Sequence, residues 1–167
     1  MVTGHSIELK KVYNILDTVT DPEIPVLTIL DLGIVRDVKI VSSEKNETSI
    51  EVLITPTYSG CPAMDVITLE IKFALIGAGY KNVIVTSVLS PAWTTDWMSE
   101  AGKKKLLQYG IAPPKLWSDR DGQTGSICCP HCQSSNTRLV SEFGGTACKA
   151  LYQCNDCKEP FDYFKCH

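Results

Sequence analysis

A helical pattern of apolar residues opens the chain. Val12, Ile15, Leu16 and Val19 recur at the i, i+3, i+4 and i+7 spacing that places side chains on one face of a helix. We therefore predict a helix that begins at about Ser6, whose hydroxyl can cap the first turn.

Five further segments have the lengths and patterns of strands and helices. Residues 34–41 and 49–55 predict two strands joined by a polar turn, because apolar and polar positions alternate in the second of them. Residues 64–76 predict a helix that is apolar on most faces and ends at glycines. Residues 82–89 predict a third strand, and residues 95–109 a last helix. We expect the apolar helix to be covered on both sides, by the sheet and by either a second layer or a partner subunit.

This order of elements, α-β-β-α-β-α, predicts the fold class. We expect residues 1–110 to form an α/β domain, a two-layer α+β arrangement with a mixed sheet. Prolines and glycines in a mainly polar stretch then predict a linker over residues 111–126. Residues 127–167 form a separate C-terminal segment, which holds seven of the eight cysteines. About forty residues bury too little surface to fold without a metal or disulfides.

Four of these cysteines are spaced as metal ligands. Cys129 and Cys132 form one C-x-x-C pair, Cys154 and Cys157 form another, and 21 residues separate the two pairs. Two such pairs supply the four thiolates of a closed tetrahedral site. We therefore predict a structural zinc ribbon with four cysteine ligands over residues 127–167. Iron in a rubredoxin-like site is an alternative, and disulfides or unpaired buried thiols are another.

Three cysteines are surplus to this tetrahedron: Cys128, Cys148 and Cys166. The simpler interpretation makes each of them a small buried residue, and we favour it. In the other interpretation they are redox-active thiols or additional ligands, which would allow a transient iron–sulfur cluster.

Composition and charge exclude several classes of protein. The chain is 44% hydrophobic and 21% charged, which is typical of a folded globular protein. Its formal net charge is −3, and its longest basic run is Lys103–Lys105, so we expect no nucleic-acid partner. We expect no membrane span, because no apolar stretch is long enough. Without a visible secretory signal, the free thiols predict a cytoplasmic protein.

The first domain contains one cysteine, in the loop between the second strand and the apolar helix. In Thr57-Tyr58-Ser59-Gly60-Cys61-Pro62, the proline suits the first helical position and places Cys61 at the N-cap. There the unpaired backbone N–H groups favour a thiolate, which would make Cys61 a reactive or metal-binding thiol. The alternative is a buried cysteine that only packs.

A second polar cluster of the first domain lies at Asp21 and Glu23, on a turn stiffened by two prolines. If this turn folds against Cys61, one sulfur and two carboxylates come together, and that set suits iron. The default interpretation is a solvated loop.

The chain also resembles a known family. The sequences D-P-E-I-P at 21–25, D-L-G-I-V at 31–35 and T-x-x-G-C-P at 57–62 resemble the SufT-like family of small iron–sulfur assembly and targeting proteins. Residues 90–97 and 146–167 are similar to one branch of that family, PaaD, the D subunits associated with bacterial phenylacetyl-CoA epoxidases.

This resemblance implies a non-catalytic accessory protein in aerobic phenylacetate degradation, which assists assembly of an iron–sulfur or di-iron centre. It implies that its partners are epoxidase subunits, either the oxygenase or the iron–sulfur flavin reductase. It also implies that Cys61 handles iron or a transient cluster, with Asp21, Glu23 and Thr57 nearby, and that the α/β domain forms a homodimer. Two alternatives stay open: a docking subunit of the oxygenase complex with no metal-transfer role, and a thiol enzyme or electron carrier.

Overall fold

The chain folds into two compact units in a computed structural model, which describes residues 3–42, 48–114 and 127–165. The units are Met1–Trp93 and Thr94–His167. This division precedes the predicted last helix of the first domain, whereas we expected it after residue 110. The physical reason is that Ile111–Ala112, at the start of the expected linker, is a strand paired within the second unit. The rest of that linker, residues 115–126, lies outside the described residues.

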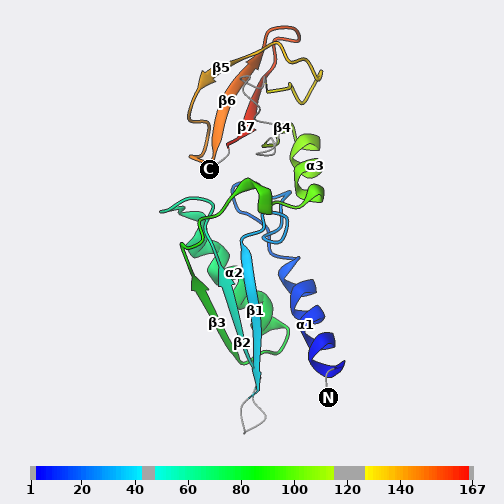
Figure 1. The fold of residues 1–167 in the computed structure, drawn as a ribbon, viewed down its shortest axis with the longest axis vertical. Coiled ribbons are helices and arrows are strands. Elements are labelled where there is room, and N and C mark those ends of the chain that lie inside the picture. Colours follow the sequence, from blue (N-terminus) through cyan, green and yellow to red (C-terminus); the bar gives the residue numbers. More distant parts are fainter. Residues whose placement is uncertain (1–2, 43–47, 115–126, 166–167) are drawn as a thin grey trace. The chain divides into compact units, whose positions relative to one another are not determined.

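The first unit is a three-stranded mixed sheet with two helices (Figure 1). Its elements are α1 (Thr3–Leu16), β1 (Val35–Ser42), β2 (Thr48–Ile54), α2 (Ala63–Gly77) and β3 (Asn82–Ser87). β2 is the central strand, antiparallel to β1 and parallel to β3. The predicted mixed sheet is thus confirmed. The first helix begins at Thr3, three residues earlier than predicted.

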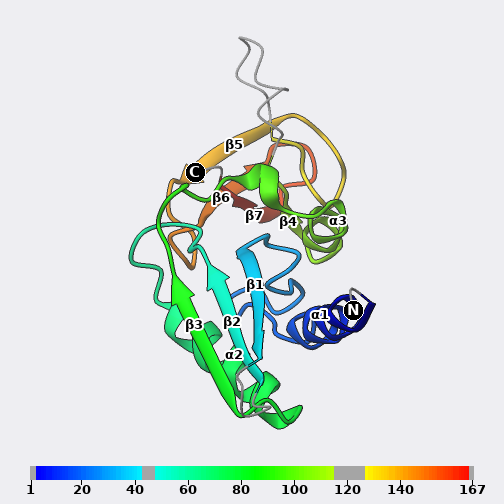
Figure 2. The same ribbon diagram turned by 60° about the horizontal axis from the view of Figure 1, so that its bottom comes forward.

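The core of this unit lies between the sheet and its helices. α2 packs against β3, and α1 packs against both α2 and β1 (Figure 2). Ile50, Val52 and Ile54 of β2 are each at most 1% exposed, while Glu51 between them is exposed. Burial of one such side chain contributes about 1.5–3 kcal/mol. The alternation in the sequence therefore identifies the face of β2 that forms the core.

Only one side of α2 is covered in this unit. Its residues Ala63, Ile67, Ile71 and Leu75 are buried. A second apolar row remains exposed on the same helix, and we call it the α2 stripe: Val66 (43%), Leu69 (53%), Phe73 (71%) and Ile76 (52%). Within the described part of the unit, no second layer covers this stripe.

The second unit contains a four-stranded sheet in the order β4-β7-β6-β5. Its elements are the 3-10 helix η1 (Thr95–Trp97), α3 (Glu100–Gln108), β4 (Ile111–Ala112), β5 (Thr137–Ser141), β6 (Lys149–Cys154) and β7 (Pro160–Phe164). The predicted single helix over 95–109 is therefore two helices. They are separate because Ser99 has extended backbone angles, and its hydroxyl accepts the Gly102 N–H at 2.8 Å to cap α3.

Aromatic residues form the core of this sheet. Tyr152 stacks on Phe161 with ring centroids 5.9 Å apart, and meets Tyr163 edge-on at 5.7 Å. Phe161 is buried together with Ala112 and the sulfur-bearing residues Cys129 and Cys154. These aromatic side chains therefore supply part of the ribbon's own core.

Candidate functional site

The second unit brings the four predicted ligand cysteines together. Their sulfur atoms all lie within 4.8 Å of one another. Cys129 Sγ is 3.7 Å from Cys157 Sγ, and Cys132 Sγ is 3.5 Å from Cys154 Sγ. A tetrahedron with metal–sulfur bonds of about 2.3 Å has sulfur–sulfur edges of about 3.8 Å. The four thiols therefore fit a tetrahedral metal ion, and the cysteines of both pairs are free rather than joined as disulfides.

Each pair lies in a tight turn that we call a knuckle. The first knuckle is residues 129–132 and the second is residues 154–157. In the first knuckle, the Gln133 N–H donates to the Cys129 carbonyl at 2.8 Å, and the Cys129 N–H donates to the Ser134 carbonyl at 2.9 Å. The second knuckle forms the turn between β6 and β7. Cys129 and Cys154 are buried, and Cys132 is exposed, so the site opens to solvent on one side.

The electrostatics of the knuckles favour a bound cation. The backbone N–H of Cys157 donates to the Cys154 sulfur and lowers the pKa of Cys154 to about 7. At Cys157 the Glu159 N–H acts in the same direction, but desolvation and the three neighbouring sulfurs outweigh it and raise that pKa to about 12. Without a metal the four thiols cannot all ionise near neutral pH. A divalent cation among them removes this conflict.

The surplus cysteines do not share one environment. Cys148 is buried, with its sulfur 3.1 Å from the Thr146 hydroxyl, as the packing interpretation expects. Cys128 is exposed, so that interpretation is wrong for it, because the chain only turns into the core at the next residue, Cys129. Cys166 lies outside the described residues.

Cys61 is half-buried in the loop that leads from β2 into α2. We predicted Cys61 as the N-cap of α2, and this prediction is wrong: the N-cap is Pro62, which has backbone angles of φ −69° and ψ −22°. Cys61 therefore precedes the cap, and its carbonyl accepts the Met64 N–H at 3.3 Å. Gly60 before it has φ +83°, a conformation that suits glycine, and this turns the chain toward the helix.

The Asp21 turn is built mainly by its own carboxylate. Asp21 Oδ1 accepts the N–H groups of Glu23 and Ile24, both at 2.8 Å. Asp21 and Glu23 are thus held together on one turn, as predicted. Among the described residues, the two carboxylates and Cys61 do not form a group of three ligand atoms of the kind the ribbon cysteines form. Thr57 is half-buried in the Cys61 loop.

The comparisons with known proteins cover both units. Residues 114–165 match the model of a family described as the PaaD zinc beta ribbon domain. Over 159 residues the chain is 46% identical to an Escherichia coli (strain K12) protein named as the D subunit of 1,2-phenylacetyl-CoA epoxidase. That match covers 95% of this chain and 93% of the E. coli protein. The chain belongs to the PaaD family.

The first unit of this PaaD family member has a separate set of relatives. Residues 9–86 match the model described as iron-sulfur cluster assembly protein. Over 92 residues the chain is 39% identical to the Fe-S protein maturation auxiliary factor YitW of Bacillus subtilis (strain 168), covering 54% of this chain and 85% of that one. A crystal structure of a domain of unknown function, DUF59, from Bacillus anthracis matches with a TM-score of 0.54 and 27% identity, over 64% of this chain and 97% of that one.

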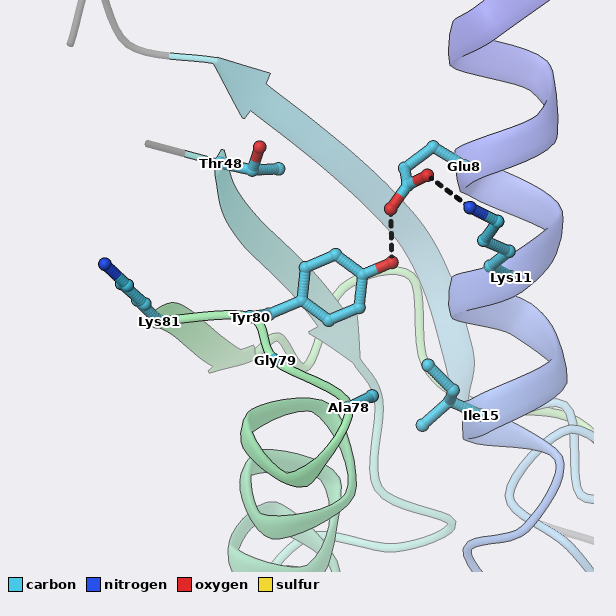
Figure 3. A pocket seen from close by; sticks show the side chains of 8 residues that line it. All are labelled: Glu8, Lys11, Ile15, Thr48, Ala78, Gly79, Tyr80 and Lys81. Atoms are coloured by element: carbon cyan, nitrogen blue, oxygen red, sulfur yellow. Dashed lines mark hydrogen bonds and ion pairs between the residues drawn. The ribbon is translucent and has the colours of Figure 1, made fainter. Parts of the chain in front are cut away.

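This PaaD family chain also has a cavity of about 410 Å³ in the first unit, between α1, the start of β2 and the segment after α2. Figure 3 shows Glu8 of α1 between Lys11 and Tyr80. The Tyr80 hydroxyl donates to Glu8 at 2.6 Å, and Lys11 forms an ion pair with Glu8 at 3.2 Å. These bonds lower the pKa of Glu8, whereas desolvation and the Glu8 carboxylate raise the pKa of Tyr80 to about 12. No sequence pattern predicted this link, because 72 residues separate its two partners.

Replacing Tyr80 with phenylalanine is expected to destabilise the first unit at neutral pH, since the bond to Glu8 is lost. The pKa of Tyr80 is about 12 in the folded protein and about 10 in the unfolded chain, so this stabilisation is complete below pH 10 and is lost as the pH rises toward 12. The difference in stability between wild type and Tyr80→Phe should therefore shrink over that range. Denaturant unfolding at several pH values measures it, with Tyr109→Phe, an exposed tyrosine, as the control. A difference that stays constant to pH 12 would contradict the assignment.

Proposed function

We propose that this chain is a cytoplasmic, non-catalytic accessory subunit that assists assembly of an iron–sulfur or di-iron centre in a phenylacetyl-CoA epoxidase. The centre under assembly is its cargo, and the oxygenase or the iron–sulfur flavin reductase is the subunit that receives it. No helix among the described residues has the length and apolar character needed to cross a bilayer.

One observation carries this proposal. Cys61 is a half-buried free thiol that takes no part in the four-sulfur group of the ribbon, in a unit that matches an iron–sulfur assembly family. We propose that Cys61 binds iron or a cluster transiently. In this proposal Asp21, Glu23 and Thr57 assist Cys61 in holding the cargo; among the described residues, Asp21, Glu23 and Cys61 do not by themselves form a ligand group.

The ribbon cysteines have a different proposed role. Cys129, Cys132, Cys154 and Cys157 would hold a structural Zn²⁺, and a bound ion supplies the crosslink between the two knuckles. A complete shell of four thiolates leaves no open coordination position, which supports a structural rather than a catalytic metal. Iron in the same shell remains the alternative, and the absorption spectrum of the purified protein separates the two metals.

A second copy of this chain is the proposed partner of the α2 stripe. A twofold interface needs a patch that is complementary to itself. The four stripe residues are spaced symmetrically about residue 71, so two antiparallel copies of α2 would place Val66 opposite Ile76 and Leu69 opposite Phe73. Pairing would cover the side of α2 that the described residues leave exposed.

The test of the main proposal is the Cys61→Ser variant. The epoxidase subunits are produced with wild type, with the variant or without this chain, and are then purified for iron analysis and assayed for phenylacetyl-CoA epoxidation. We expect the variant to give the low iron content and activity obtained without the chain, because a hydroxyl binds iron far more weakly than a thiolate.

Cys128→Ser is the matched control, since it also removes a free thiol outside the four-sulfur group. It should leave both measurements at the wild-type level. Full iron content and activity with Cys61→Ser would instead favour the alternative function, a docking subunit with no metal-transfer role.

A further inference from the structure

The two knuckles of the ribbon are joined by polar side chains as well as by sulfur. Asp156, inside the second C-x-x-C pair, accepts two hydrogen bonds from residues that follow the first pair. The Ser134 hydroxyl donates to Asp156 Oδ2, and the Asn136 amide donates to Asp156 Oδ1 at 2.8 Å. Both carboxylate oxygens therefore face the other knuckle's segment.

The neighbouring residue, Asn155, adds two more bonds between the same segments. Its backbone N–H donates to the Asn136 carbonyl at 2.8 Å, and its side-chain amide donates to Asn136 Oδ1 at 2.9 Å. Asn136 in turn is positioned by its own N–H, which donates to the Ser134 hydroxyl at 3.0 Å. The two central residues of the C-N-D-C sequence thus both bind across to the segment after the first knuckle.

We propose that Ser134, Asn136, Asn155 and Asp156 form a polar clasp that holds the two knuckles in metal-binding register, with Asp156 as the central positioning residue. This inference rests on the metal site proposed above. None of these bonds involves a cysteine side chain, so the clasp links the two knuckles in addition to the bonds that the ion makes.

The clasp lowers the conformational entropy that is lost when the two knuckles bind one metal ion. Some twenty residues separate the two knuckles in the chain, and bringing them together costs conformational entropy. Each exposed hydrogen bond of the clasp is weak by itself because water competes with it. Asp156 strengthens its bonds through its charge, and four bonds between the same two segments reinforce one another. When one metal–sulfur bond breaks, the clasp keeps that thiolate close to the ion, and this slows complete release of the ion.

The test measures zinc release from the full-length protein. Zinc-loaded wild type and Asp156→Asn are mixed with an excess of a chromogenic chelator, and the rate of zinc transfer is recorded. Changes to residues that support metal ligands commonly cost about 10- to 100-fold in affinity, and we expect zinc release from Asp156→Asn to be about ten-fold faster. Ser134→Ala should give a smaller increase, because it removes one of the two bonds to Asp156.

Glu142→Gln is the matched control. It removes the same charge from the second unit, outside both knuckles, and the exposed Glu142 side chain makes no hydrogen bond or ion pair with a described residue. Its release rate should stay within about two-fold of wild type. Cobalt-loaded Asp156→Asn should keep the absorption bands of a four-thiolate site, which shows that the ligands are unchanged and that only their positioning is lost.

The outcomes separate this inference from the proposal beneath it. If wild type binds no metal ion, the ribbon site itself fails. If wild type binds zinc and Asp156→Asn releases it no faster than Glu142→Gln, the clasp alone is overturned. If Asp156→Asn cannot retain zinc at all, Ser134→Ala decides: an intermediate rate supports the clasp, and a wild-type rate overturns it.

Discussion

Removing the metal from the ribbon is expected to unfold the strand region of the second unit while the first unit stays folded. Metal binding in small zinc domains supplies about 10–16 kcal/mol of apparent free energy, which exceeds the stability of most small domains. Here the buried thiols Cys129 and Cys154 lie in the same core cluster as Phe161. Losing the ion therefore leaves that core with thiols that repel one another once ionised.

Amide hydrogen exchange on the full chain measures this effect after chelation. We expect residues 127–165 to lose protection, and β2 and α2 of the first unit to keep it. Cys154→Ser should reproduce the result without a chelator, and Cys128→Ser should not, because Cys128 lies outside the four-sulfur group. Full protection of β6 in the metal-free chain would show that the aromatic core suffices and that the metal is not structural.

The second large effect is expected at the α2 stripe. Light scattering should give the molar mass of a dimer for the wild-type chain and that of a monomer for Phe73→Lys. Phe73 is the most exposed member of the stripe, at 71%, and a charge there would be buried against apolar groups of the second copy. Losing a central aromatic anchor commonly costs about 2 kcal/mol or more, which weakens association by about 30-fold or more.

Ile84→Lys is the matched control for this experiment. Ile84 is also an exposed apolar residue of the first unit, at 50%, but it lies on β3 rather than on α2. Its replacement should leave the dimer intact, since lysine is well tolerated on an edge strand. A wild-type chain that remains monomeric at high concentration would refute the second copy as partner, and the stripe would then need a different subunit.

Local patterns were enough to predict most elements of the fold. The spacing of Val12 and Leu16 and the alternation of Ile50, Val52 and Ile54 each identified a buried face, because one period of side chains faces the core. The two C-x-x-C pairs likewise identified the four cysteines whose sulfur atoms the structure brings together, since a knuckle is formed within four consecutive residues. In both cases the deciding interactions join residues that are close together in the sequence.

The tertiary structure alone decided the features that depend on residues far apart. It placed Asp156 against Ser134, left the α2 stripe exposed, and assigned β4 to the second unit through its pairing with β7. It also placed the N-cap of α2 at Pro62, one residue later than the sequence predicted. Sequence periodicity reports which side chains avoid water, and only the packed chain determines which distant groups then meet.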